Sequence, residues 1–202
     1  MSSVSDVVAA VRAGELVVIP TDTVYGLACT PYREAPVLRL SGLKGRSPDQ
    51  PVALVAASVD WLLECVPELR GQSATLARAL LPGPFTLVLP NPAQRFPWLT
   101  GSRPATIGVR VPDLAGQAEA ALEAIGIVAA TSANVHGRPD PRRLDDVPPE
   151  IRSGVAATLD GGELPGAPST VVDVTGPAPV VVREGAVPSA VALARVHEAL
   201  AE

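Results

Sequence analysis

The chain has 202 residues, of which 47% are hydrophobic and only 3% aromatic, so Val, Leu, Ala and Ile must fill its core. A formal net charge of −5 argues against a broad basic face for nucleic acid, although a local basic pocket remains compatible with it. No basic start precedes a long apolar run, and no run approaches the ~20 residues of a membrane span. We therefore expect a cytoplasmic protein with no signal peptide and no membrane association. Its two cysteines suit core thiols better than a disulfide framework.

Predicted helices and strands alternate through the first half of the chain. Apolar residues at helical spacing predict helices over 3–13, 37–44, 61–66 and 74–81. Short apolar runs bounded by turn residues predict strands over 16–19, 52–56 and 85–89.

The second half continues this alternation. The predicted strands are 106–111, 127–130, 155–159, 170–174 and 180–183, and the predicted helices are 114–125 and 189–200. Such intermixing favours an α+β fold with α/β-type layers, in which helices pack on a mixed sheet within a single domain over 1–202. The segment 137–150 is a candidate mobile loop over a site, and 161–168 is a second flexible loop.

Lys44-Gly45-Arg46 places two cations two residues apart, directly after a predicted helix. A lysine point charge beside the bidentate fork of an arginine suits a phosphate group. The glycine between them lets the backbone approach a ligand. A solvated basic turn is the alternative that the local sequence leaves open.

Thr131-Ser132-Ala133-Asn134 follows the apolar run 127–130, so a hydroxyl and an amide fall at the end of a predicted buried strand. Small-molecule sites in open sheets favour that location. Turn or helix-capping chemistry is the open alternative, because Ser and Asn suit it equally well.

Other polar residues lie at strand ends or inside strands. Thr21 follows the first predicted strand and Ser169 precedes a late one, where a turn and ordinary strand initiation are the alternatives. Arg110 lies within an apolar strand, where a charge is costly unless it is paired, bound to a ligand or turned to solvent. Arg138 and Arg183 could equally be surface arginines.

Several common chemistries find little support. The chain has no Gly-x-x-x-x-Gly-Lys-Ser/Thr loop and no Gly-x-Gly-x-x-Gly fingerprint. His136 and His197 are far apart, which argues against a hydrolytic triad and against a His-based metal site.

Six motifs, taken in order, resemble the YrdC family, whose members are threonylcarbamoyl-AMP synthases. They are Pro20 to Leu27, Lys44-Gly45-Arg46, Pro82-Gly83-Pro84-Phe85-Thr86, Gly108-Val109-Arg110-Val111-Pro112, Ser132-Ala133-Asn134 and Ser169-Thr170-Val171-Val172. The resemblance runs from about Val4 to the end of the chain and is to the short form, without the extra C-terminal domain of longer relatives.

The resemblance implies a twisted mixed sheet around a concave, locally positive pocket. It also implies a nucleotidyltransferase that turns L-threonine, bicarbonate or carbon dioxide, and ATP into threonylcarbamoyl-AMP and pyrophosphate, for N6-threonylcarbamoyladenosine in tRNA. Mg²⁺ would arrive with ATP, and no structural metal is implied. A separate threonylcarbamoyl transferase complex would act on tRNA, so this chain would contact tRNA weakly or indirectly.

The resemblance also implies roles for individual residues. The central catalytic cluster would be Lys44, Arg46, Ser132 and Asn134. The ATP contacts would be Lys44, Arg46, Thr106, Ser132, Arg138 and Arg183. The L-threonine contacts would be Thr21, Arg110 and Ser169, with Arg110 pairing the carboxylate. Lys44→Ala and Arg46→Ala would then each abolish most activity while the fold survives.

Two positions depart from the family pattern. Ser47 stands where relatives usually have proline, with Pro48 one place later, and Val55 aligns where many relatives carry histidine. One competing hypothesis is a non-catalytic module that binds RNA or a ribosome assembly intermediate, which predicts a basic surface. Another is a carbamoyl-adenylate-forming domain of the hydrogenase-maturation type, but the Cys-x-x-Cys segments found with it are missing here.

Overall fold

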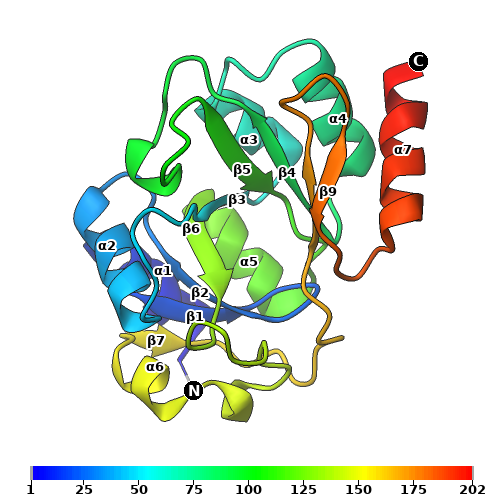
Figure 1. The fold of residues 1–202 in the computed structure, drawn as a ribbon. Helices are drawn as coiled ribbons and strands as arrows, with labels where there is room; N and C mark the ends of the chain where they lie inside the picture. The colour runs from blue at the N-terminus through cyan, green and yellow to red at the C-terminus, as the bar shows by residue number, and fades with distance from the viewer. Residues whose placement is uncertain (1, 202) are drawn as a thin grey trace.

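The computed structural model describes residues 2–201 and contains a mixed β-sheet with helices on both faces (Figure 1). The strands are β1 Val17–Pro20, β2 Tyr25–Cys29, β3 Ala53–Ala56, β4 Phe85–Pro90, β5 Thr106–Arg110, β6 Ile127–Ser132, β7 Ala157–Thr158, β8 Thr170–Asp173 and β9 Val180–Arg183. The α-helices are α1 Val4–Ala13, α2 Glu34–Leu43, α3 Val59–Cys65, α4 Gln72–Leu80, α5 Gly116–Ile125, α6 Pro149–Ser153 and α7 Ser189–Ala201. Two short 3₁₀ turns cover Pro97–Leu99 and Leu144–Asp146.

The strands follow the order β7-β1-β2-β6-β3-β5-β4-β8-β9. Three neighbouring pairs are parallel, namely β1 with β7, β3 with β5, and β4 with β8, and the other pairs are antiparallel. This mixed sheet with flanking helices confirms the predicted fold class.

Successive side chains of each strand point to opposite faces of the sheet, and they pack into two separate hydrophobic cores. On one face, Val17, Ile19 and Val128 pack with residues of α1 and α5. On the other face, apolar strand residues pack with α2, α3, α4 and α7, and α4 and α7 run side by side (Figure 1). Among the described residues, the core that α1 and α5 cover on this face contains strand residues of β7, β1, β2, β6 and β3 and none of β5, β4, β8 or β9.

Helix α1 shows how local sequence sets an element. Ser3 caps its N-terminus, and the Ser3 and Asp6 side chains each accept a hydrogen bond from the other residue's backbone N–H. Gly14 ends the helix in the left-handed conformation, with φ of 85°, which glycine adopts without strain. Val7, Val8 and Val11 form the buried face, as the sequence predicts.

Three elements of the structure differ from those predicted from the sequence. Strand β2 was not predicted, because Tyr25–Cys29 contains no β-branched residue and its small residues carry little strand propensity. The predicted strand 155–159 shortens to Ala157–Thr158. This strand lies at the edge of the sheet, where it pairs with Val17 and Val18 of β1. Helix α6 lies partly inside the segment predicted to be a mobile loop.

Two segments expected to be flexible are tied to the β1–β2 hairpin. The Tyr25 hydroxyl lies 2.9 Å from Asp160 Oδ1 and 2.8 Å from Gly162 O, and it accepts a hydrogen bond from the Gly161 N–H at 2.9 Å. Burial raises the pKa of this phenol to about 12. The Tyr25 N–H donates to Pro141 O at 3.0 Å. These bonds argue against free motion of either segment.

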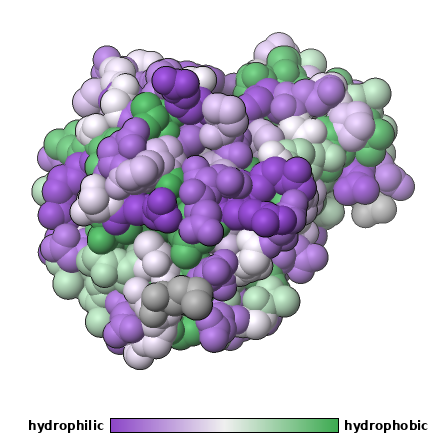
Figure 2. Space-filling view, turned by 90° about the horizontal axis from the view of Figure 1, so that it is seen from below, coloured by the Kyte–Doolittle hydropathy of each residue, from purple (hydrophilic) through white to green (hydrophobic). Residues whose placement is uncertain are grey.

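The face seen from below, where β7 and α6 lie, is mainly hydrophilic, and its apolar patches are small and scattered (Figure 2). Arginines in this region pair with acidic residues: Arg142 with Glu163 at 3.0 Å, and Arg152 with Asp145 at 3.4 Å. No helix between residues 2 and 201 has the length and apolar character needed to cross a bilayer.

Candidate active site

A cavity of about 390 Å³ lies over β5, β4, β8 and β9 and extends onto residues of β3, β6 and β2. Alternate residues of neighbouring strands form its floor, because only every second side chain faces it. The floor residues are Gly26 of β2, Ala53 and Val55 of β3, Thr86 and Val88 of β4, Thr106, Gly108 and Arg110 of β5, Ala130 and Ser132 of β6, and Val171 of β8. Small residues at the centre of the sheet thus leave room for a ligand.

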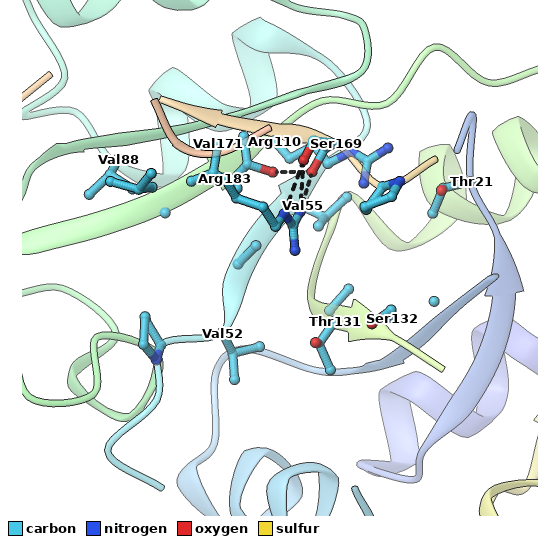
Figure 3. A pocket seen from close by; sticks show the side chains of 18 of the residues that line it. Thr21, Val52, Val55, Val88, Arg110, Thr131, Ser132, Ser169, Val171 and Arg183 are labelled. Carbon is cyan, nitrogen blue, oxygen red and sulfur yellow. Dashed lines mark hydrogen bonds between the residues drawn. The ribbon is translucent and has the colours of Figure 1, made fainter. Parts of the chain in front are cut away.

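The cavity has a polar part and an apolar part (Figure 3). Thr21, Arg110, Ser132 and Ser169 lie toward one side, whereas Val88 lies at the other side with Val171 near it. A ligand with a charged group and an apolar or aromatic group would match this division.

Four arginines line the cavity, and its lining within residues 2–201 contains no carboxylate. Two of them pair with acidic residues behind the wall: Arg110 with Asp22, and Arg103 with Asp173 at 2.9 Å. The other two, Arg46 and Arg183, bond only to neutral oxygens among the described residues. The cavity therefore carries excess positive charge and suits an anionic ligand.

Arg110 reaches the cavity from the end of β5 and is 8% exposed. Its Nη2 donates to the Asp22 carboxylate and to Thr23 Oγ1, the latter at 2.7 Å. Its Nε is buried and has no partner among the described residues. Burial lowers the pKa of this guanidinium, and the Asp22 charge opposes the shift. Nη1 makes no hydrogen bond among the described residues and is not fully buried, so it is the donor left for a ligand oxygen.

Arg46 and Arg183 lie on opposite walls. Arg46 donates from Nη1 to Thr131 Oγ1 at 3.3 Å and from Nη2 to Pro51 O at 2.7 Å, while its buried Nε has no partner among the described residues. Arg183 donates from Nη2 to Ser169 O at 2.8 Å and to Ser169 Oγ at 3.1 Å. Burial lowers the pKa of both guanidinium groups.

Lys44 is the single lysine of the chain and is 3% exposed. Its ammonium donates to Ser132 O, to Asn134 O at 2.7 Å and to Asn134 Oδ1 at 2.8 Å. Three donors thus meet three protein oxygens. Burial, and then the neighbouring charge of Arg46, lowers the lysine pKa from 10.5 to about 8. Lys44 is not among the cavity-lining residues of the described chain, so here it supports the wall and does not face the ligand space.

The Ser132-Ala133-Asn134 turn is built around the same lysine. Ser132 Oγ donates to Asn134 Oδ1 at 2.6 Å, and Asn134 Nδ2 donates to Arg138 O. Asn134 is 7% exposed and lies outside the cavity lining, whereas Ser132 lines the cavity. Because its hydrogen is used, the Ser132 oxygen is left as an acceptor at the cavity wall.

The structure brings most of the predicted site residues together. Arg46, Ser132, Thr106, Arg183, Thr21, Arg110 and Ser169 all line the cavity. Arg138 does not line it and is exposed, so only its backbone contributes here, by accepting a hydrogen bond from Asn134. Thr21 closes the β1–β2 turn, where its hydroxyl donates to Val24 O at 2.7 Å.

Two of the cavity-lining residues, Arg103 and Thr86, were not predicted to be site residues. Arg103 precedes β5 and was indistinguishable from a surface arginine, since only its contacts with Asp173 and Thr175 place it. Thr86 belongs to the Pro-Gly-Pro-Phe-Thr motif quoted for the family resemblance, and that motif was the available signal. Its hydroxyl lies 2.8 Å from Ser169 Oγ.

Known proteins are similar to this chain in sequence and in fold. The model of the Sua5_yciO_yrdC family, described as "Telomere recombination", matches residues 9–185. The chain belongs to this family. The threonylcarbamoyl-AMP synthase of Pyrococcus abyssi is 36% identical over 183 residues, which are 88% of this chain and 52% of that protein. A putative threonylcarbamoyl-AMP synthase of Mycobacterium tuberculosis is 36% identical over 181 residues, which are 89% of this chain and 82% of that protein.

Solved structures of family members agree with the fold. P. abyssi Sua5 complexed with L-threonine matches with a TM-score of 0.85 and 33% identity, covering 98% of this chain and 57% of that chain. E. coli YciO matches with a TM-score of 0.80 and 27% identity, covering 92% of this chain and 90% of that chain. The chain thus spans only about half the length of the Pyrococcus protein.

The two departures from the family pattern fall in different places. Val55 faces the cavity directly beside Arg110, with which it is paired across β3 and β5. Ser47 lies outside the cavity lining and forms a turn, in which its hydroxyl accepts a hydrogen bond from the Asp49 N–H at 3.2 Å. Only the first departure changes the surface that a ligand would meet.

Proposed function

We propose that this chain is a threonylcarbamoyl-AMP synthase, which joins L-threonine, bicarbonate or carbon dioxide, and ATP, and releases pyrophosphate. The observation that carries the proposal is the cavity itself, which four arginines line and to which the described residues contribute no carboxylate. The names of the relatives support this choice of reaction, and L-threonine was bound to the Pyrococcus family member.

The amino acid would occupy the polar part of the cavity. Arg110, whose Nη1 has no partner among the described residues and whose Nη2 is held by Asp22, would pair the carboxylate. Thr21 and Ser169 would add hydroxyl contacts on either side. Ser132, whose oxygen remains an acceptor, would receive an N–H of the substrate amine.

The nucleotide phosphates would lie near the two arginines without carboxylate partners, Arg46 and Arg183. Thr106 would contact the nucleotide from the edge of the floor. Lys44 and Asn134 would act here by holding the Ser132 turn. A direct contact of Lys44 or Arg138 with ATP stays a prediction that requires their side chains to turn toward the cavity.

The reaction needs positioning and charge neutralisation more than a covalent nucleophile. The threonine amine would attack the carbon of carbon dioxide and lose a proton, which gives a carbamate. A carbamate oxygen would then attack the α-phosphorus of ATP, and the bond to pyrophosphate would break with its electron pair leaving on pyrophosphate. Arginines on both walls would offset the charge that gathers on the phosphates.

Mg²⁺ would be bound mainly by ATP phosphates and water. Residues 2–201 contain no cluster of three or more His, Cys, Asp or Glu that could hold a metal ion. When bound, it would neutralise phosphate charge during transfer.

The partners follow from the product. Threonylcarbamoyl-AMP would pass to a threonylcarbamoyl transferase complex in the cytoplasm, with tRNA contacted weakly or not at all. Eight of the sixteen cationic side chains pair with carboxylates, which counts against the alternative of a basic RNA-binding surface.

Pyrophosphate release tests the proposal. The assay contains ATP, magnesium and bicarbonate, with L-threonine, L-serine or no amino acid. Threonine-dependent release, with a product of the mass of threonylcarbamoyl-AMP, would support the synthase. No release, together with salt-dependent RNA binding, would overturn it in favour of the RNA-binding module.

A further inference from the structure

Strand β4 lies between the strands that carry the proposed ligand residues. Its neighbour β5 holds Arg110, and its other neighbour β8 follows Ser169. Thr86 of β4 is paired with Val171 of β8 and faces the cavity. Thr86 therefore lies between the two strands, although the proposed reaction does not itself require a contact with it.

The Thr86 hydroxyl is 2.8 Å from Ser169 Oγ in a buried contact. Thr86 is 9% exposed, and this is the only hydrogen bond that its side chain makes among the described residues. A buried hydroxyl hydrogen needs an acceptor. Either hydroxyl can be the donor in this contact, and the bond runs from Thr86 to Ser169 when a ligand accepts the Ser169 hydrogen.

Ser169 Oγ also accepts a hydrogen bond from Arg183 Nη2 at 3.1 Å. A serine hydroxyl has two acceptor lone pairs and one hydrogen. When Thr86 donates as well, Thr86 and Arg183 occupy both lone pairs, and the Ser169 hydrogen is the group left for a ligand. A serine held in this way presents a donor and favours an anionic acceptor over an ammonium group.

We propose that Thr86 is a positioning residue, which fixes the Ser169 hydroxyl as a hydrogen-bond donor to the carboxylate of the bound amino acid. This inference rests on the proposed function. Thr86 acts through Ser169, and Arg183 holds the Ser169 backbone independently of Thr86. Loss of the Thr86 hydroxyl should therefore affect the amino acid more than the nucleotide.

The test compares Thr86→Val, which keeps the shape and loses the hydroxyl, with Thr86→Ser, which keeps the hydroxyl. We expect Thr86→Val to raise the KM for L-threonine about tenfold, the size of effect typical of one lost hydrogen bond. The KM for ATP should stay within about twofold of wild type, and Thr86→Ser should restore the KM for L-threonine. Thr86→Ala serves as a second hydroxyl-free variant if Thr86→Val does not fold.

A double-mutant cycle separates positioning from packing. In a Ser169→Ala background, Thr86→Val should raise the KM for L-threonine no further. An unchanged KM in Thr86→Val, equal increases for L-threonine and ATP, or additive effects with Ser169→Ala would each overturn the inference. Wild-type protein without threonine-dependent pyrophosphate release would instead overturn the proposed function, which makes the two failures distinguishable.

Discussion

Lys44 donates two hydrogen bonds to Asn134, 90 positions further along the chain, at 2.7 Å to the backbone oxygen and 2.8 Å to Oδ1. This contact ties the end of α2 to the turn that follows β6. Ser132, which lines the cavity, is the residue that the contact holds in place. The single lysine of the chain thus stabilises the turn that forms part of the cavity wall.

Lys44→Met should lower both stability and activity. Three oxygens would lose the ammonium donor, although Asn134 Oδ1 keeps its bond from Ser132 Oγ, and each oxygen left unsatisfied costs about 1–3 kcal/mol. We expect the free energy of unfolding in urea to fall by at least about 2 kcal/mol. The expectation from sequence was a loss of activity in a chain that still folds, and the hydrogen bonds of Lys44 add an expected loss of stability to it.

Arg46→Met provides the matched control, because this side chain is half-buried at the cavity wall. It should lose most threonine-dependent pyrophosphate release while its unfolding free energy stays within about 1 kcal/mol of wild type. Equal stability of the two variants would show that the hydrogen bonds of Lys44 do not stabilise the fold.

The titration of Lys44 can be followed directly, because metabolic labelling with ¹³Cε-lysine gives one lysine signal. We expect a midpoint of about 8, well below the ordinary 10.5, owing mainly to burial. The unfolded chain would then bind more protons than the folded chain between these two pH values, so the contribution of Lys44 to stability should rise with pH across that window. A midpoint above 10 in the folded protein would contradict the expected lowering of the lysine pKa by burial.

Arg110→Met should weaken L-threonine binding about a hundredfold, because a charge-assisted pair with the carboxylate would be lost. Asp22→Asn is the control: its amide oxygen can still accept from Arg110, and we expect a change of no more than about fivefold. Isothermal calorimetry with L-threonine measures both. Similar affinities for wild type and Arg110→Met would remove Arg110 from the amino-acid site.

Gly185→Ala should displace the backbone that positions Ser169 in the cavity wall. A Cβ at Gly185 would lie 2.1 Å from Pro168 O, so the backbone that carries Ser169 would have to move. We expect a loss of about 1–3 kcal/mol in stability together with weaker L-threonine binding. At Gly176 the nearest atom to an added Cβ is 3.7 Å away, and Gly176→Ala should behave like wild type in thermal unfolding and in binding. Identical behaviour of the two variants would contradict the expected clash.

Much of the site was visible in the sequence because polar residues interrupt apolar runs at strand ends. Ser132 and Arg110 could be picked out in this way. Strand β2 could not, since its small residues have weak strand propensity and only its pairing with β1 and β6 defines it.

The amino-acid sequence by itself determined the alternation of elements, the α+β class and the set of polar motifs, because periodicity and strand-end chemistry are local properties. Only the tertiary structure decided which of these residues face the ligand space. Lys44 turned inward because three oxygens from the β6 turn surround its ammonium, and Arg103 and Thr86 joined the cavity because β5, β4 and β8 lie side by side. Contacts between residues distant in the chain depend on the order in which the strands pair, which the residue pattern of a single strand does not specify.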